Sequence, residues 1–287
     1  MAKQLKENYF IVLHGMDLHK KVITSLFYSF IFIYFLSGGS IAYGEEKDYV
    51  VLQEKGWKIT KEGYQYKTLI GKHKESTSSF ELIFLKFNPY KFNLKIIPYS
   101  SIATYPVFVN RYTDLKKKNI AIINGGYFDE RGKHLGFLKI NNKIYRRNVA
   151  THPIYSGIIL PDAQKKIIHS SLFNPKQHKN AIQVGPLLIR DGKVNPGLKN
   201  TESVHYRSGL GIDNDGDFIL FATNTNYGGI SWKTLVNILK GKGFDFINVI
   251  NLDGGGSTQL FFKKNGKNIL YRGIKAVPTA LLVELRE

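Results

Sequence analysis

Two short polar stretches follow apolar, β-branched runs and carry the residues best suited to chemistry. One reads Asn-Gly-Gly-Tyr-Phe-Asp over residues 124–129, after the run 120–123. The other reads Asn-Leu-Asp-Gly-Gly-Gly-Ser-Thr over residues 251–258, after the run 246–250. Glycines permit backbone conformations with positive φ and let a ligand approach backbone N–H groups closely. Because each stretch begins where a strand is expected to end, we predict that the two strand ends open into a shared pocket.

Asp253 is the sharpest candidate for a catalytic group, since it lies directly before three glycines. A carboxylate held at a strand end is partly desolvated, which raises its pKa toward the range useful for general acid or base catalysis. The N–H groups of Gly254, Gly255 and Gly256 are expected to form a concave site for a phosphate or a developing oxyanion. The alternative is a structural turn in which Asp253 only accepts hydrogen bonds from local N–H groups.

Three further residues have side chains that suit a phosphorylated or sugar ligand. Asn124 is both donor and acceptor, which fits a sugar hydroxyl or phosphate oxygen, unless it only caps a tight turn. Tyr127 either stacks on a sugar ring or packs in the core. Arg207, at the entry to another strand, can bind a phosphate through two hydrogen bonds, although a lone arginine is commonly a surface charge.

Other polar residues are weaker candidates. Asp129 is a possible second carboxylate, but the residues after it indicate a solvated turn. His205 has a side chain suited to acid–base chemistry, but a single histidine is more often structural or exposed. The acidic run 213–217 fails the EF-hand pattern, because Phe218 and Asn224 stand where glycine and glutamate are required, and it is better explained as a hairpin turn. We assign no metal ligands and expect no cofactor, and the sequence leaves a metal requirement open.

The elements that must position these residues are mostly strands. One helix is predicted over residues 231–240, with Ser231 as its N-cap, an apolar face beginning at Trp232, and Gly241 at its end. A second helix is predicted over 104–117. Alternating or continuous apolar residues predict strands at 49–53, 66–70, 80–87, 92–98, 120–123, 136–140, 155–160, 166–169, 181–184, 187–190, 209–213, 218–222, 246–251, 258–262 and 276–285.

Many strands with few helices, without βαβ alternation, predict an α+β fold with a largely antiparallel or mixed sheet, forming a single globular domain. We expect residues 1–44 to be an export signal, since Lys20 and Lys21 precede an apolar run at 22–36 that is followed by small residues ending at Gly44. The run is shorter than the roughly 20 residues of a membrane span; the alternative is an uncleaved anchor. Met16 is a possible true start. The protein is then periplasmic or secreted.

Composition narrows the choice of partners. The chain has no cysteine, which excludes disulfides, thiol nucleophiles and thiolate metal sites. Its net charge is +19, and residues 1–44 hold four lysines and two acidic residues, so the rest carries +17. This charge favours anionic partners such as phosphates or acidic glycans, unless the lysines are simply solvated. We find no nucleic-acid signature.

The chain resembles the phosphodiester glycosidase family, which includes the lysosomal uncovering enzyme and exported bacterial proteins associated with exopolysaccharide. The resemblance runs from about residue 80 to the C-terminus, so the expected domains are the signal at 1–44, N-terminal strands of uncertain affiliation at 45–79, and the family domain at 80–287. It rests on four ordered blocks: Asn124-Gly125-Gly126-Tyr127-Phe128, Gly185-Pro186 with Asp191-Gly192, Arg207-Ser208-Gly209-Leu210-Gly211, and Asn251-Leu252-Asp253-Gly254-Gly255-Gly256-Ser257.

The resemblance implies hydrolysis of a sugar-1-phosphodiester at the glycosidic C–O bond, acting on envelope or extracellular glycans. By this carry-over Asp253, Arg207 and Asn124 are the catalytic residues. The implied substrate-binding residues are Gly125, Gly126, Tyr127, Gly185, Gly254, Gly255, Gly256 and Ser257. The competing hypotheses are a non-catalytic binder of anionic envelope glycans, a phosphodiesterase that cleaves the P–O bond, and a structural envelope protein. A membrane contact is expected only through an uncleaved signal.

Overall fold

The computed structural model describes residues 48–98, 107–112, 119–163, 166–241 and 243–287. Residues 47–287 form one compact unit. All strand pairs within it are antiparallel, which confirms the predicted largely antiparallel α+β architecture. In the described part, no helix is long and apolar enough to cross a membrane. The predicted export signal lies outside the described residues, as does most of the helix predicted over 104–117. Of that helix only residues 107–112 are described, and they form an isolated β-bridge at Val107 and the 3-10 turn η2 (Val109–Tyr112) instead of an α-helix.

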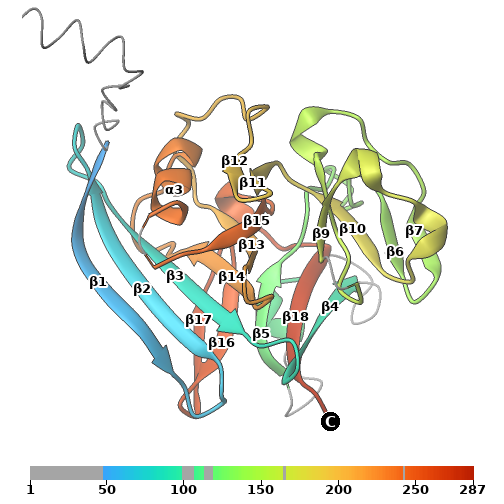
Figure 1. Cartoon of the computed structure of the whole chain (residues 1–287), viewed down its shortest axis with the longest axis horizontal. Helices are drawn as coiled ribbons and strands as arrows, with labels where there is room; N and C mark the ends of the chain where they lie inside the picture. The colour runs from blue at the N-terminus through green and yellow to red at the C-terminus, as the bar shows by residue number, and fades with distance from the viewer. Residues whose placement is uncertain (1–47, 99–106, 113–118, 164–165, 242) are drawn as a thin grey trace, which may run out of the picture. The chain divides into compact units, whose positions relative to one another are not determined.

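The largest sheet carries two of the three segments that meet at the site. The first three strands, β1 (Tyr49–Ile59), β2 (Gln65–His73) and β3 (Ser79–Phe87), run side by side in Figure 1. Residues 65–72 of β2 pair with β3, which joins the N-terminal strands to the rest of the sheet. In spatial order the strands are β1 (Tyr49–Ile59), β2 (Gln65–His73), β3 (Ser79–Phe87), β14 (Phe218–Thr223), β13 (Ser208–Asp213), β15 (Phe246–Asn251), β11 (Leu187–Arg190) and β12 (Lys193–Val194).

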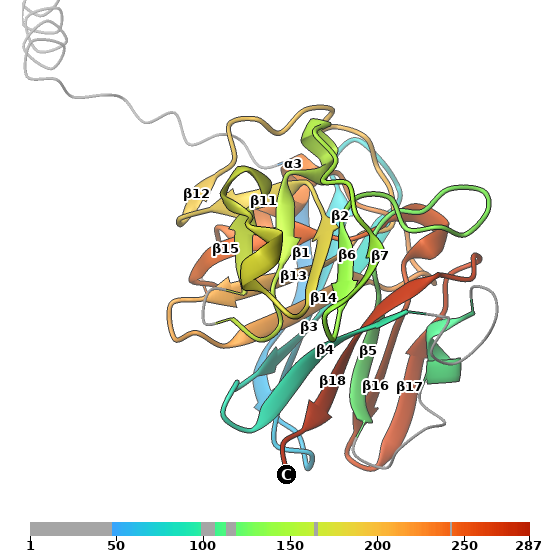
Figure 2. The ribbon, with the colours of Figure 1, turned by 90° about the vertical axis from the view of Figure 1, so that its right-hand side faces the viewer.

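Two five-stranded sheets complete the unit, and one of them is seen with its strands side by side in Figure 2. That sheet consists of β17 (Lys267–Tyr271), β16 (Leu260–Lys264), β5 (Asn119–Asn124), β18 (Thr279–Leu285) and β4 (Phe92–Pro98). The other consists of β7 (Lys143–Arg146), β6 (Leu138–Ile140), β10 (Ala181–Val184), β8 (Gly157–Ile159) and β9 (Ile167–His169). Short 3-10 turns are η3 (Pro153–Tyr155), η4 (Ser170–Leu172), η5 (Pro175–Gln177) and η6 (Gly255–Ser257).

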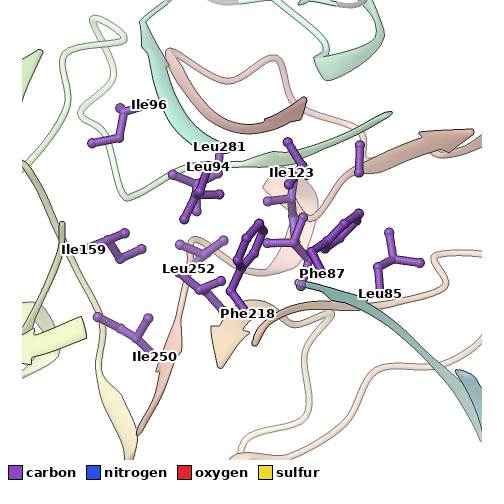
Figure 3. Close-up of a cluster of buried hydrophobic side chains, with 14 of the residues drawn as sticks. Leu85, Phe87, Leu94, Ile96, Ile123, Ile159, Phe218, Ile250, Leu252 and Leu281 are labelled. Atoms are coloured by element: carbon purple, nitrogen blue, oxygen red, sulfur yellow. The ribbon is translucent and has the colours of Figure 1, made fainter. Parts of the chain in front are cut away.

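The main core lies where the three sheets face one another. Leu252 is fully buried there and lies among Leu94 of β4, Leu281 of β18 and Phe218 of β14, so both the eight-stranded sheet and one five-stranded sheet contribute (Figure 3). On the opposite face of the eight-stranded sheet, helix α3 (Trp232–Leu239) packs its apolar side against a second cluster. Burial of this apolar surface is the main force that holds the sheets together.

Helix α3 begins as predicted, because the Oγ of Ser231 accepts a hydrogen bond from the N–H of Thr234 at 3.0 Å. Strands β10 and β11 match their predicted ranges. Strands β7, β12 and β17 are not predicted. Their side chains are mostly exposed, so they lack the apolar pattern that marks a buried strand. The turns before β7 and β12 do carry a sequence signal, because Asn141-Asn142 and Asp191-Gly192 are residue pairs typical of hairpin turns. All four residues have positive φ in the structure, as such turns require.

Candidate functional site

Three chain segments that are far apart in the sequence meet at one place. Antiparallel pairing puts the first residues of β13 opposite the last residues of β15. Beyond the paired residues, the N–H of Leu252 donates to the carbonyl of Ser208 at 2.9 Å, which brings Arg207 and Asp253 to the same end of the sheet. The N–H of Asp253 then donates to the carbonyl of Gly125 at 3.0 Å, immediately after β5. The site therefore lies where two sheets join.

Asn124, the last residue of β5, connects that strand to the 253–259 loop. Its side chain is fully buried. The Nδ2 group donates to the carbonyl of Asp253 at 2.8 Å, and the Oδ1 atom accepts from the N–H of Gln259 at 3.1 Å. The hydroxyl of Ser208 donates to the same Asp253 carbonyl at 3.0 Å. The predicted convergence of Asn124 and Asp253 is thus present, and the Asn124 amide is used to position the loop.

Asp253 is partly buried, and burial raises the pKa of its carboxyl group above the ordinary value. Three groups act in the opposite direction: the hydroxyl of Ser257 and the N–H of Gly254 bond to the carboxylate, and the positive charge of Lys275 stabilises its ionised form. A carboxylate whose pKa is raised while hydrogen bonds hold it in place is suited to accepting or donating a proton.

The glycines after Asp253 differ from the expected concave site of three free N–H groups. The N–H of Gly254 bonds to the Asp253 carboxylate, and the N–H of Gly255 donates to the carbonyl of Tyr206 at 2.8 Å. Of these three glycine N–H groups, only that of Gly256 has no hydrogen-bond partner among the described residues. The positive φ of Gly255, +57°, lets the loop turn tightly enough to make these contacts. The local turn therefore uses two of the three donors.

Arg207 is 5% exposed, so its charge is buried. Its Nε donates to the carbonyl of Ile230 at 3.2 Å, its Nη2 donates to the carbonyl of Ser203 at 2.6 Å, and the guanidinium lies 4.4 Å from the ring centre of Trp232. No ion pair of Arg207 is found among the described residues, and burial lowers its pKa to about 10. Its Nη1 lies 4.0 Å from where a Cβ on Gly254 would be, beside the glycine loop.

Tyr127 and Tyr155 form an aromatic pair beside this loop, with ring centres 5.7 Å apart and planes at 86°. The hydroxyl of Tyr127 donates to the carbonyl of Gly185 at 3.0 Å and accepts from the Nδ2 of Asn251 at 3.3 Å. Burial raises the pKa of both tyrosines, and the negative charge of Asp253 raises it further.

The other glycines of the motifs are placed where the backbone packs tightly. An added Cβ would collide with the side chain of Thr279 at Gly125, with that of His134 at Gly126, and with the carbonyl of Ile154 at Gly185. At Gly126 the distance to the His134 Cε1 atom would be 2.6 Å. These contacts explain the glycines by close approach of protein backbone and side chains.

The weaker candidates lie in local structure. The Oδ1 of Asp129 accepts from the N–H groups of Arg131 at 3.0 Å and Lys133 at 2.8 Å, which is a turn. His205 is exposed and pairs through its backbone with residue 230. The acidic run 213–217 joins β13 to β14 as the predicted hairpin.

In that hairpin, the Nζ of Lys86 lies 2.6 Å from Asp213 and 3.4 Å from both Asp215 and Asp217, so a lysine already forms ion pairs with all three carboxylates. No metal-binding group of three or more acidic or histidine side chains occurs in the described ranges.

Sequence reasoning did not single out Tyr155, Trp232 or the side chain of Asn251. Trp232 is visible in the sequence only as part of the apolar face of a helix, and Tyr155 only as the start of a predicted strand. Asn251 belongs to a motif but shows no signal of its own. Its Oδ1 accepts from the Trp232 indole at 3.1 Å, a contact between residues on two different elements.

Two solved structures show the same fold. The catalytic domain of zebrafish N-acetylglucosamine-1-phosphodiester alpha-N-acetylglucosaminidase, auto-inhibited by its pro-peptide, aligns with a TM-score of 0.56 at 18% identity, over 85% of this chain and 86% of that one. A hypothetical protein from Synechocystis aligns with a TM-score of 0.56 at 16% identity. That alignment covers 78% of this chain and 62% of the Synechocystis chain, less than two thirds of its length.

Among curated protein sequences, none matches the chain. The model of the phosphodiester glycosidase family matches residues 117–284, more than half of the chain. The match includes Asn124, Arg207 and Asp253, and it includes the strands that bring them together. The chain therefore belongs to the phosphodiester glycosidase family.

Proposed function

We propose that the protein is an exported glycosidase that hydrolyses a sugar-1-phosphodiester of the N-acetylglucosamine-1-phosphate type at the glycosidic C–O bond. Family membership supports a glycosidase-type function with a phosphorylated carbohydrate as substrate. The observation that carries the proposal is the buried guanidinium of Arg207, which has no carboxylate partner among the described residues and lies beside the loop of Asp253.

A buried charge without a counter-ion is costly, so a site that keeps one is suited to an anionic ligand. The carbonyls of Ser203 and Ile230 and the ring of Trp232 fix the orientation of the guanidinium before any ligand binds. The Nη1 group is then available to donate to a phosphate oxygen. Stabilisation of the departing phosphate by Arg207 lowers the barrier to C–O cleavage, because charge develops on this leaving group in the transition state.

Asp253 is assigned the second role. Its carboxylate removes a proton from water as the water attacks the anomeric carbon, or stabilises the positive charge of an oxocarbenium-like transition state. The phosphodiester leaves as a weak base, so acid assistance is less necessary than for an alkyl glycoside. Asn124 and Ser208 act as positioning residues, because they hold the backbone of Asp253.

The substrate-binding part of the proposal rests on Tyr127 and the glycine loops. The hydroxyl of Tyr127 is already bonded to Gly185, so Tyr127 orders the wall of the site, and the partly exposed Tyr155 offers a ring to a sugar. Residues 1–44 are proposed as a cleaved export signal, with envelope or extracellular glycans as the setting. Residues 45–79 are proposed to belong with the catalytic domain, since β1 and β2 extend its largest sheet.

The test is a panel of sugar-1-phosphodiesters assayed for release of free sugar, with Asp253→Asn as the inactive comparison and Lys193→Gln as an exposed control. Hydrolysis in ¹⁸O-labelled water then locates the broken bond. Label in the sugar supports C–O cleavage, and label in the phosphate supports a phosphodiesterase instead. Binding without release of sugar by the wild-type protein would support a glycan-binding protein.

A further inference from the structure

A pocket with two arginines in its wall lies at the hairpin of β6 and β7, in the five-stranded sheet that contains β6 to β10. It has a volume of about 240 Å³ and is lined by Gly136, Tyr145, Arg146, Arg147 and Asn148. Pockets for drug-sized ligands measure roughly 300–1,000 Å³. This arginine pocket is therefore matched to a smaller group, such as one ionised substituent with part of its sugar ring.

The charge of the arginine pocket is not neutralised locally. The sequence holds no aspartate or glutamate between Glu130 and Asp162. The Nε of Arg146 donates to the carbonyl of His134 at 2.8 Å, which fixes the side chain and leaves both Nη groups without a recorded partner in the described part of the chain. Arg147 is exposed and likewise has no recorded partner there. Two guanidinium groups with free planar donors are suited to a carboxylate or phosphate.

The arginine pocket is built on residues that also support the proposed active site. The ring of His134 packs against Gly126, and its Nε2 donates to the carbonyl of Gln183 at 3.1 Å. The side chain of Gln183 accepts from the N–H of Phe137 at 3.0 Å, next to Gly136 in the pocket wall. One buried network therefore connects the pocket to the 124–129 loop.

We propose that the arginine pocket binds an anionic group, a carboxylate or a phosphate, on the glycan chain that carries the scissile sugar. The glycan context rests on the proposed function, whereas the affinity for an anion rests on the pocket alone. In this arrangement Arg146 is held in place by its bond to His134, and the exposed Arg147 adds a second donor. The site selects acidic glycans over neutral ones.

The test measures binding to Asp253→Asn protein, in which turnover does not interfere, by titration calorimetry at low salt. The probes are a tetramer of galacturonic acid, a neutral tetramer of N-acetylglucosamine and inorganic phosphate. Arg147→Gln is compared with Lys193→Gln, which removes the same charge from exposed β12. We expect Arg147→Gln to weaken binding of the acidic tetramer about tenfold, the scale of one charged hydrogen-bonded contact, with no effect on the neutral tetramer.

An equal loss in Lys193→Gln, or no loss in Arg147→Gln, would overturn the proposal. If Arg147→Gln also weakens the binding of inorganic phosphate about tenfold, the pocket binds anions, but the anion does not need to be attached to a glycan. Because Arg147 is exposed, we expect its substitution to leave the melting temperature unchanged, and measuring that temperature verifies that the variant folds. Failure of the wild-type protein to release sugar would overturn the proposed function but leave this binding result standing. If both hold, Arg147→Gln raises KM for acidic substrates without lowering kcat.

Discussion

Replacing Asn124 by alanine tests whether this residue positions the 253–259 loop or contacts a ligand. The change removes the bond from Nδ2 to the Asp253 carbonyl and the bond from the Gln259 N–H to Oδ1. The first bond is partly buried and the second is buried, and each is worth about 1 kcal/mol net. The stranded N–H of the buried Gln259 adds about 1–2 kcal/mol because no water reaches it. The Asp253 carbonyl keeps its bond from Ser208. We therefore expect a loss of about 3–4 kcal/mol in the free energy of unfolding.

For a domain of this size that loss corresponds to a fall of about 6–16 °C in melting temperature. Calorimetry and urea unfolding measure it directly. Ser208→Ala is the matched control, since it removes a single bond to the same carbonyl and is expected to cost about 1 kcal/mol. Turnover of Asn124→Ala should fall through kcat, because Asp253 is displaced. Unchanged stability together with a raised KM would refute the reasoning, since it would mean that the Asn124 amide is free to bind substrate.

Three further predictions follow from the charges. Asp253→Asn is expected to reduce turnover at least about a hundredfold. Because burial raises the pKa of Asp253, the stability that this group contributes is fully present at low pH, where the carboxyl is protonated, and is lost as the pH rises through the folded-state pKa. The Asp253→Asn variant should therefore have a higher free energy of unfolding than the wild type at pH 7, and this difference should disappear in acid. His134 has the opposite sign: burial lowers its pKa from 6.5 to about 4, so the stability that it contributes is full above pH 6.5 and falls by about 3 kcal/mol on acidification to pH 4. Urea titrations of His134→Gln should show a flatter pH dependence, and identical curves would contradict the assignment. Inorganic phosphate should raise the melting temperature of the wild type, by linkage to binding, and this increase should shrink in Arg207→Gln but not in Lys193→Gln.

Much of the local structure follows from the sequence because its causes lie within a few residues. The alternation of apolar side chains marks most strands, Ser231 marks the start of α3, and the paired turn residues mark two hairpins. The glycine motifs also indicate the three segments of the candidate site. Strands β7 and β17 are not predicted because their side chains are mostly exposed at the edge of a sheet and therefore show no apolar pattern along the sequence.

The tertiary structure decided what each motif residue does. Asn124 and Asp253 are 129 positions apart, and only the junction of two sheets turns the amide of one into a support for the backbone of the other. The same is true of Arg207, whose burial against Trp232 depends on where α3 packs. Hydrogen-bond partners and buried charges are set by contacts between distant elements, whereas strand and turn propensities are set by neighbours along the chain. The sequence by itself therefore determined which segments carry polar groups at strand ends. Packing determined which of those groups form hydrogen bonds within the protein and which are left without a protein partner.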